Sequence, residues 1–116
     1  MKIYHNTSCS KSNAALDLLQ QNGITPEVVE YLHNTPTKEE LTAILAMLNL
    51  KPLQLIRTNE QLFQEKFANM NLSDEEWIDV MLQYPILIER PIIVKDGKAV
   101  IGRPVEKVLN LLKLNI

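Results

Sequence analysis

The chain has 116 residues, of which 46% are hydrophobic and 22% are charged, the composition of an ordinary globular protein. Its formal net charge of −2 creates no overall field that would attract nucleic acid or an anionic membrane, so both are excluded as expected partners. Any anion-binding site must be built locally. We expect a single α/β domain over residues 1–116, because this length is enough for one hydrophobic core.

The N-terminal segment and the single cysteine predict where the protein works. Residues 1–6 lack the apolar stretch of a secretory signal peptide, and no apolar run is long enough to cross a bilayer. Cys9 is the only cysteine, so no disulfide can form within one chain. We predict a cytoplasmic location, because a chain without disulfides fits a reducing compartment.

The first part of the chain predicts a strand, a helix and a second strand. Residues 2–4 form the expected first strand, and a polar turn leads into a helix that runs to about Asn22. Gly23 suits the C-terminal cap of that helix. Residues 27–31 are rich in β-branched side chains and predict the second strand. A unit of this kind places its two strands in parallel.

The middle of the chain is predicted to be helical throughout. Three pairs of residues have the spacing of a capping box, in which two side chains three residues apart cap the start of a helix reciprocally. These pairs are Thr37 with Glu40, Thr58 with Gln61, and Ser73 with Glu76. We therefore predict three helices in this block.

The last part predicts a β-hairpin and a final helix. Two apolar runs, residues 92–94 and 99–101, flank an Asp-Gly pair at 96–97, which is a strong hairpin signal. Pro104 suits the first turn of the final helix. The order β-α-β, three helices, β-β-α predicts an α/β thioredoxin-like fold. In that fold a four-stranded mixed sheet carries a helical insertion between the βαβ unit and the C-terminal ββα unit.

Cys9 is the candidate nucleophile. It lies between the first predicted strand and the first predicted helix, where free backbone N–H groups and the helix dipole create a positive environment. This environment stabilises a thiolate, lowers the thiol pKa and also favours a bound oxyanion. Most lone cysteines are instead small buried hydrophobes. The neighbours of Cys9 are polar, however, and none of them indicates a core position.

Ser12 occupies the position of the second cysteine in a Cys-x-x-Cys motif. The segment Cys9-Ser10-Lys11-Ser12 is therefore a version with one thiol, and a dithiol reaction within the motif is excluded. No group of Cys, His, Asp and Glu residues has metal-ligand spacing. We predict no metal and no tightly bound cofactor.

The arginines differ from the lysines in their surroundings. The twelve basic residues comprise nine lysines, mostly among polar neighbours, and three arginines, Arg57, Arg90 and Arg103, in apolar or turn contexts. Arginine offers a planar fork of donors that matches a tetrahedral oxyanion, whereas lysine is a flexible point charge. The alternative is that each arginine caps a helix carbonyl or pairs with a carboxylate such as Glu89.

Five short motifs follow one another over nearly the whole chain. They are Ile3-Tyr4-His5-Asn6 leading to Cys9-Ser10-Lys11-Ser12, Tyr31-Leu32 before Thr35-Pro36-Thr37, Leu55-Ile56-Arg57, Ile88-Glu89-Arg90-Pro91-Ile92, and Ile101-Gly102-Arg103-Pro104. Together they resemble the glutaredoxin-dependent arsenate reductase family of the ArsC type, and within it the YfgD-like branch.

The resemblance implies a specific set of roles. A cysteine at the position of Cys9 attacks arsenate, and arginines at the positions of Arg57, Arg90 and Arg103 hold the oxyanion and its thiol adduct. A histidine matching His5 lies near the cysteine and helps to favour its thiolate. By residue type alone, an isolated histidine after a strand is more often a structural hydrogen-bonding group.

Three further positions bear on the resemblance. The proline that matches Pro91 corresponds to the cis-proline of thioredoxin-like folds. Many family members have proline at the position of Thr7 and arginine at the position of Asn13. The first departure changes the stiffness of the loop before Cys9, and the second removes a positive charge one helical turn after Cys9.

The resemblance implies arsenate as the substrate, glutathione as the co-substrate and glutaredoxin as the protein partner. The sequence leaves the oligomeric state open, and a monomer is the simplest case. Two alternatives stay open. A monothiol glutaredoxin-like oxidoreductase would act on glutathione mixed disulfides and would suit Cys9 with Ser12, but it needs fewer than three arginines. A regulator of the Spx type would bind RNA polymerase, but such proteins commonly carry Cys-x-x-Cys as a redox switch.

Overall fold

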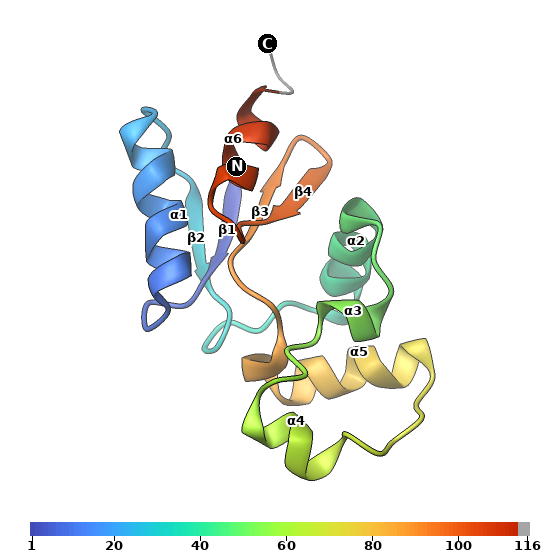
Figure 1. Ribbon diagram of the computed structural model, residues 1–116. Helices are drawn as coiled ribbons and strands as arrows, with labels where there is room; N and C mark the ends of the chain where they lie inside the picture. Colours follow the sequence, from blue (N-terminus) through green and yellow to red (C-terminus); the bar gives the residue numbers. More distant parts are fainter. Residues whose placement is uncertain (114–116) are drawn as a thin grey trace. The chain divides into compact units, whose positions relative to one another are not determined.

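The computed structural model describes residues 1–113, and the chain forms two compact units (Figure 1). The first unit joins residues 1–34 to the segment that begins at Arg90, and the second comprises residues 35–89. The second unit corresponds to the block that the sequence predicts to be helical. No helix within residues 1–113 combines the length and the apolar character that crossing a membrane requires.

A four-stranded mixed sheet forms the centre of the first unit (Figure 1). β1 (Lys2–His5) pairs in parallel with β2 (Glu27–Glu30) and antiparallel with β3 (Ile92–Lys95), which in turn pairs antiparallel with β4 (Lys98–Ile101). The strand order is therefore β2-β1-β3-β4. This arrangement confirms the predicted mixed sheet of the thioredoxin-like fold.

Helix α1 (Ser10–Gln21) connects the two parallel strands. Ala15 and Leu19, four residues apart on one face of the helix, are fully buried. The helix ends as predicted, because Gly23 has a φ of 76° and lets the N–H of Ile24 bond back to the carbonyl of Leu19 at 2.9 Å.

Helix α6 (Glu106–Lys113) follows β4 and packs on the same face of the sheet as α1. One core cluster joins side chains of both helices to side chains of β1 and β3: Ile3, Ala15, Leu19, Ile93, Val108 and Leu111. Burying each of its valine, leucine and isoleucine side chains contributes about 1.5–3 kcal/mol. The cluster therefore fixes α1 and α6 against β1 and β3.

The β3–β4 hairpin also forms as predicted. Lys95 pairs with Lys98, and the two residues between them, Asp96 and Gly97, both have positive φ values of 50° and 77°. Two positive φ values in a two-residue loop match the right-handed twist of the adjoining strands, which explains the Asp-Gly sequence.

The second unit contains more helices than the sequence predicts. Its elements are α2 (Lys38–Leu48), α3 (Pro52–Leu55), α4 (Gln61–Lys66), α5 (Asp74–Gln83) and the 3₁₀ helix η1 (Pro85–Leu87). Within this unit the Lys38 ammonium on α2 bonds to Glu75 at 2.9 Å and lies 3.2 Å from Asp79, both on α5. Helix α3 escapes prediction because four residues are too short to show a hydrophobic period.

Two of the three predicted capping boxes form, and the third is wrong. Thr37 caps α2 and Ser73 caps α5, each with its reciprocal glutamate. The cap position of α4 is Glu60, not Thr58. The side chain of Gln64 instead donates to the carbonyl oxygen of Thr58 at 2.6 Å. The backbone at Thr58 thus bonds to the helix that its side chain was expected to cap.

Candidate active site

Cys9 lies at the N-terminal cap of α1, as the sequence predicts. Its backbone is extended, with φ −103° and ψ 119°, and its carbonyl accepts from the N–H of Asn13 at 3.0 Å. The N–H groups of the first helical turn have no partner within the helix and point toward the cap. The sulfur, in a residue that is only 8% exposed, therefore lies at the positive end of the helix.

The surroundings of Cys9 favour its thiolate form. Burial raises the pKa of the Cys9 thiol, but hydrogen bonds from the Ser12 N–H, the Arg90 guanidinium and the Lys11 N–H outweigh it and lower the pKa below the ordinary value. The positive charge of Arg90 acts in the same direction. A lowered pKa increases the thiolate fraction, and the thiolate is the nucleophilic form of cysteine.

Arg103 also reaches the sulfur of Cys9. Its Nη2 atom donates to Sγ at 3.3 Å, and its Nε atom donates to the carbonyl oxygen of Arg90 at 2.6 Å. Two bonds from one planar guanidinium fix the direction of the side chain. The structure therefore brings Cys9, Arg90 and Arg103 together at one point.

The strand register explains this meeting of distant residues. Ile92 of β3 pairs with Ile101 of β4, so Arg90 and Arg103, each two residues outside that pair, leave the sheet at the same end. Tyr4 of β1 pairs with Ile92, which places the start of α1 at this end as well. The peptide bonds from Arg90 to Pro91 and from Arg103 to Pro104 are cis. At Pro91 this agrees with the resemblance.

His5 and Ser12 form a buried polar pair beside the Cys9 loop. His5 Nδ1 and Ser12 Oγ are 2.5 Å apart, and the N–H of Asn6 donates to the same hydroxyl at 3.1 Å. Burial lowers the pKa of His5, while Glu30 and Asn13 oppose the shift. At pH 7 the ring is therefore mainly neutral and adds little positive charge. Its support of the thiolate stays a prediction, and its observed contact is with Ser12.

The two positions that depart from the family pattern share one hydrogen bond. Nδ2 of Asn13 donates to the carbonyl oxygen of Thr7 at 3.0 Å. Asn6 adds a second local tie, because its Oδ1 atom accepts from the N–H of Ser8 at 2.9 Å. Side chain to backbone bonds of this kind shape short turns. They hold the loop before Cys9, which in this chain lacks a proline.

Arg57 lies in the second unit, where carboxylates surround it. Its Nε atom lies 3.5 Å from Glu60 Oε1 and 3.9 Å from Glu89 Oε1, as the alternative of a carboxylate pair anticipates. Its Nη1 atom is buried without a hydrogen-bond partner among residues 1–113. A buried donor in this state can accommodate a ligand oxygen. The place of Arg57 in the oxyanion site stays a prediction.

Comparison with known proteins decides the family. The ArsC family model matches residues 4–111. This chain belongs to the ArsC family. The uncharacterized protein YfgD of Escherichia coli K12 is 45% identical over 113 residues, which cover 96% of this ArsC chain and 95% of YfgD. An arsenate reductase of Neisseria meningitidis is 41% identical over 110 residues, which cover 93% of this chain and 94% of that enzyme.

A solved ArsC structure has the same fold. The arsenate reductase from Vibrio cholerae superposes with a TM-score of 0.89 at 42% identity, covering 95% of this chain and 97% of that one. The match confirms the thioredoxin-like ArsC fold over nearly the whole chain. The resemblance inferred from the five motifs is therefore also confirmed.

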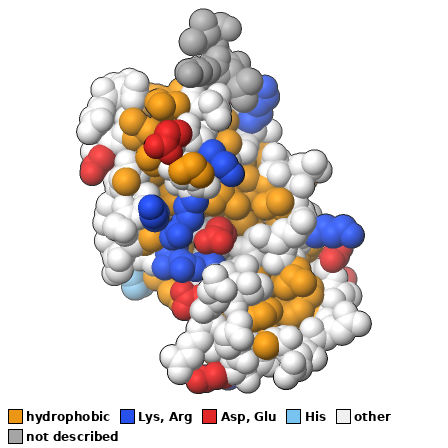
Figure 2. Space-filling model, viewed as in Figure 1, with side chains coloured by type: hydrophobic (Ala, Val, Ile, Leu, Met, Phe, Trp, Pro, Cys, Tyr) orange, Lys and Arg blue, Asp and Glu red, His pale blue; other side chains and the backbone are white. Residues whose placement is uncertain are grey.

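Two properties of this ArsC chain show that its site is local. Figure 2 shows Lys and Arg side chains next to Asp and Glu side chains on the face in view, and the formal net charge is only −2. Within residues 1–113, no three His, Cys, Asp or Glu side chains gather as metal ligands would. Anion binding by the guanidinium groups and backbone N–H groups at Cys9 stays a prediction.

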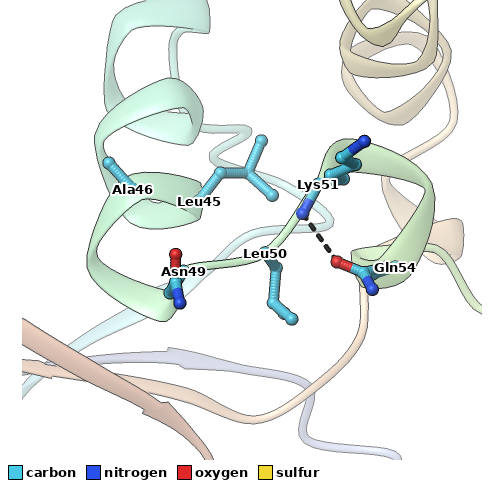
Figure 3. A pocket seen from close by; sticks show the side chains of 6 residues that line it. All are labelled: Leu45, Ala46, Asn49, Leu50, Lys51 and Gln54. Carbon is cyan, nitrogen blue, oxygen red and sulfur yellow. Dashed lines mark hydrogen bonds between the residues drawn. The ribbon is translucent and has the colours of Figure 1, made fainter.

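A cavity of the ArsC chain lies elsewhere, within the second unit. It has a volume of about 340 Å³, and Figure 3 shows the six lining residues on the segment from the end of α2 to α3. Lys51 is the only one with an ionisable side chain. Its backbone N–H donates to Gln54 Oε1 at 2.8 Å. The lining contains no thiol and none of the residues assigned to the Cys9 site.

The sequence did not reveal every residue that shapes the Cys9 site. The sequence singled out Asn13 only because many family members have arginine at this position. Its hydrogen bond to the carbonyl oxygen of Thr7 is visible only in the structure. Asn6, which is 6% exposed, bonds to the loop in a way that its residue type permits but does not require. No sequence signal identified either contact, because both depend on the path of the folded loop.

Proposed function

We propose that this chain reduces arsenate to arsenite through a covalent adduct on Cys9. The observation that carries the proposal is the Arg103 guanidinium at 3.3 Å from Sγ of a cysteine at a helix N-terminus. One point thus offers a nucleophile and donors for a tetrahedral oxyanion. Arsenate reductases among the relatives support arsenate as the anion.

The first step forms the adduct. The Cys9 thiolate attacks arsenic, a sulfur–arsenic bond forms, and hydroxide leaves and takes a proton to become water. Arsenic keeps its oxidation state of V in this step. Arg90, Arg103 and, as a further proposed ligand, Arg57 stabilise the charged oxygens of the adduct. The N–H groups of Lys11 and Ser12 favour the anionic sulfur before attack.

The second step transfers two electrons to arsenic. A glutathione thiolate attacks Sγ, a disulfide between Cys9 and glutathione forms, and the electron pair of the sulfur–arsenic bond stays with arsenic. Arsenite, with arsenic in the III state, leaves. Glutaredoxin then attacks the glutathione sulfur and restores the Cys9 thiolate.

The number of thiols requires an external reductant. Reduction of arsenate consumes two electrons, and one thiol becomes a disulfide only with a second thiol. This chain has a single cysteine, so the second thiol must come from another molecule in every cycle. Glutathione is the abundant small thiol of the cytoplasm, and glutaredoxin acts on its mixed disulfides.

A coupled assay tests the proposal. Purified protein is mixed with glutathione, glutaredoxin, glutathione reductase and NADPH, and NADPH oxidation is followed with and without arsenate. We expect oxidation that depends on arsenate with the wild-type protein and none above background with folded Cys9→Ser.

Two other results would contradict the proposal. Reduction of a glutathione mixed disulfide without arsenate and without added glutaredoxin would indicate a monothiol oxidoreductase. Inactivity in both assays, combined with retention of RNA polymerase in a pull-down, would indicate a regulator of the Spx type.

A further inference from the structure

We propose that Gly102 is a positioning residue for the active-site thiol. The absence of a side chain at this position lets the end of β4 lie directly against Pro91. Only this close approach brings the guanidinium of Arg103 to the sulfur of Cys9. The catalytic consequence rests on the function proposed above, whereas the effect on the thiol itself does not.

The first observation is the space around Gly102. A Cβ atom at this position would lie 3.0 Å from Cγ of Pro91, 3.3 Å from Cδ1 of Ile93 and 3.3 Å from Cγ2 of Val108. These distances are shorter than ordinary van der Waals contacts between carbon atoms. Ile93 and Val108 are fully buried members of the core cluster, and Pro91 is fully buried as well. The neighbours therefore have little room to yield.

The other two glycines show that Gly102 is needed for a different reason. Gly23 and Gly97 have φ values of 76° and 77°, which favour glycine, and a Cβ at either would meet no atom within 4 Å. Gly102 is not among the residues with positive φ, so its backbone conformation is open to alanine. The requirement at Gly102 is for space alone.

The second observation is the chain of contacts that leads from Gly102 to the sulfur. The N–H of Gly102 donates to the carbonyl oxygen of Pro91 at 2.9 Å. The next residue, Arg103, bonds through Nε to the carbonyl of Arg90 and through Nη2 to Sγ of Cys9. The side chain that makes both guanidinium contacts thus extends from a backbone segment that is hydrogen-bonded to Pro91.

The consequence follows from the geometry of a planar fork. A Cβ at position 102 must push the segment away from Pro91 by some tenths of an ångström. The guanidinium of Arg103 already spans two acceptors, at 2.6 Å and 3.3 Å. It cannot keep both hydrogen bonds when the backbone of Arg103 moves. The longer contact, to the sulfur, is the one that is lost first, because hydrogen bonds weaken with distance and misalignment.

The test is a measurement of the Cys9 thiol pKa in Gly102→Ala, from the rate of iodoacetamide alkylation against pH. We expect a rise of up to about one pH unit, the effect of losing a hydrogen bond to the charged form. Gly23→Ala is the matched control, since it strains a glycine with positive φ at the far end of α1. The control should lower thermal stability and leave the thiol pKa unchanged.

A double-mutant cycle identifies the route of the effect. If Gly102 acts by positioning Arg103, Gly102→Ala should cause no further rise in the thiol pKa when Arg103→Ala is already present. An unchanged pKa in Gly102→Ala, or an equal rise with and without Arg103, would overturn the proposal.

A second variant covers the case in which Gly102→Ala does not fold. Adding Ile93→Val removes the Cδ1 methyl at 3.3 Å and gives the new Cβ more room. The same pKa outcomes then apply, and loss of folding in this variant too would reject a role specific to the site. The measurement needs no arsenate, so a wild-type protein inactive toward arsenate would refute the proposed function and leave this result standing.

Discussion

Replacing Arg103 by lysine or alanine tests the centre of the proposed site. The structure gives this side chain two contacts, with Cys9 Sγ at 3.3 Å and with the Arg90 carbonyl at 2.6 Å. A hydrogen bond to a charged group contributes about 1.5–3 kcal/mol. Because Arg103 is only partly buried, solvent screening favours the lower end. A loss of about 1.4 kcal/mol corresponds to one unit of thiol pKa or a tenfold change in rate.

The two variants separate charge from shape. Arg103→Ala removes both contacts, so we expect the thiol pKa to rise by roughly one unit and arsenate turnover to fall about tenfold or more. Arg103→Lys keeps the positive charge but cannot span two acceptors. We expect its pKa to lie between those of the wild type and Arg103→Ala, with turnover impaired nearly as much as in alanine.

The assays are alkylation against pH and the coupled assay for arsenate reduction. Lys98→Ala is the matched control, because it removes one positive charge from an exposed side chain at the opposite end of β4. The control should behave like the wild type in both assays. Wild-type kinetics in both Arg103 variants would refute the reasoning and assign Arg103 a structural role.

Four further predictions concern the pKa of the Cys9 thiol, the pH dependence of stability, the arginine of the second unit and the source of electrons. The Cys9 pKa is lowered on folding, so the alkylation midpoint should lie below the free-thiol value of about 8.5. The thiolate should stabilise the fold above that value, and this contribution should be lost as pH falls through the lowered pKa. Urea titrations at several pH values measure the free energy of unfolding of wild type and Cys9→Ser. The same pH dependence in both proteins would contradict this prediction. Arg57→Lys should keep the fold and reduce arsenate turnover by about tenfold, whereas unchanged kinetics would show that Arg57 serves only Glu60 and Glu89. Turnover should require glutathione with glutaredoxin, and efficient turnover with thioredoxin and no glutathione would contradict the electron route.

The sequence by itself determined the features that depend on neighbouring residues. The Asp96-Gly97 turn, the cap of α1 at Gly23 and the capping boxes at Thr37 and Ser73 all formed as predicted. Each of these features needs only a few residues with particular backbone or side-chain preferences. The position of Cys9 at the start of α1 belongs to the same class, because a strand followed directly by a helix determines it.

The tertiary structure alone decided which distant groups meet at the sulfur. Arg103 contacts Cys9 across 94 positions of sequence, and that contact depends on the pairing of Ile92 with Ile101 and on the packing of Gly102 against Pro91. Local patterns carry no information on such packing, since it depends on the shapes of side chains that the fold brings together. The capping box predicted from the spacing of Thr58 and Gln61 was wrong for the same reason. The path of the chain places the carbonyl of Thr58, and not its side chain, against α4.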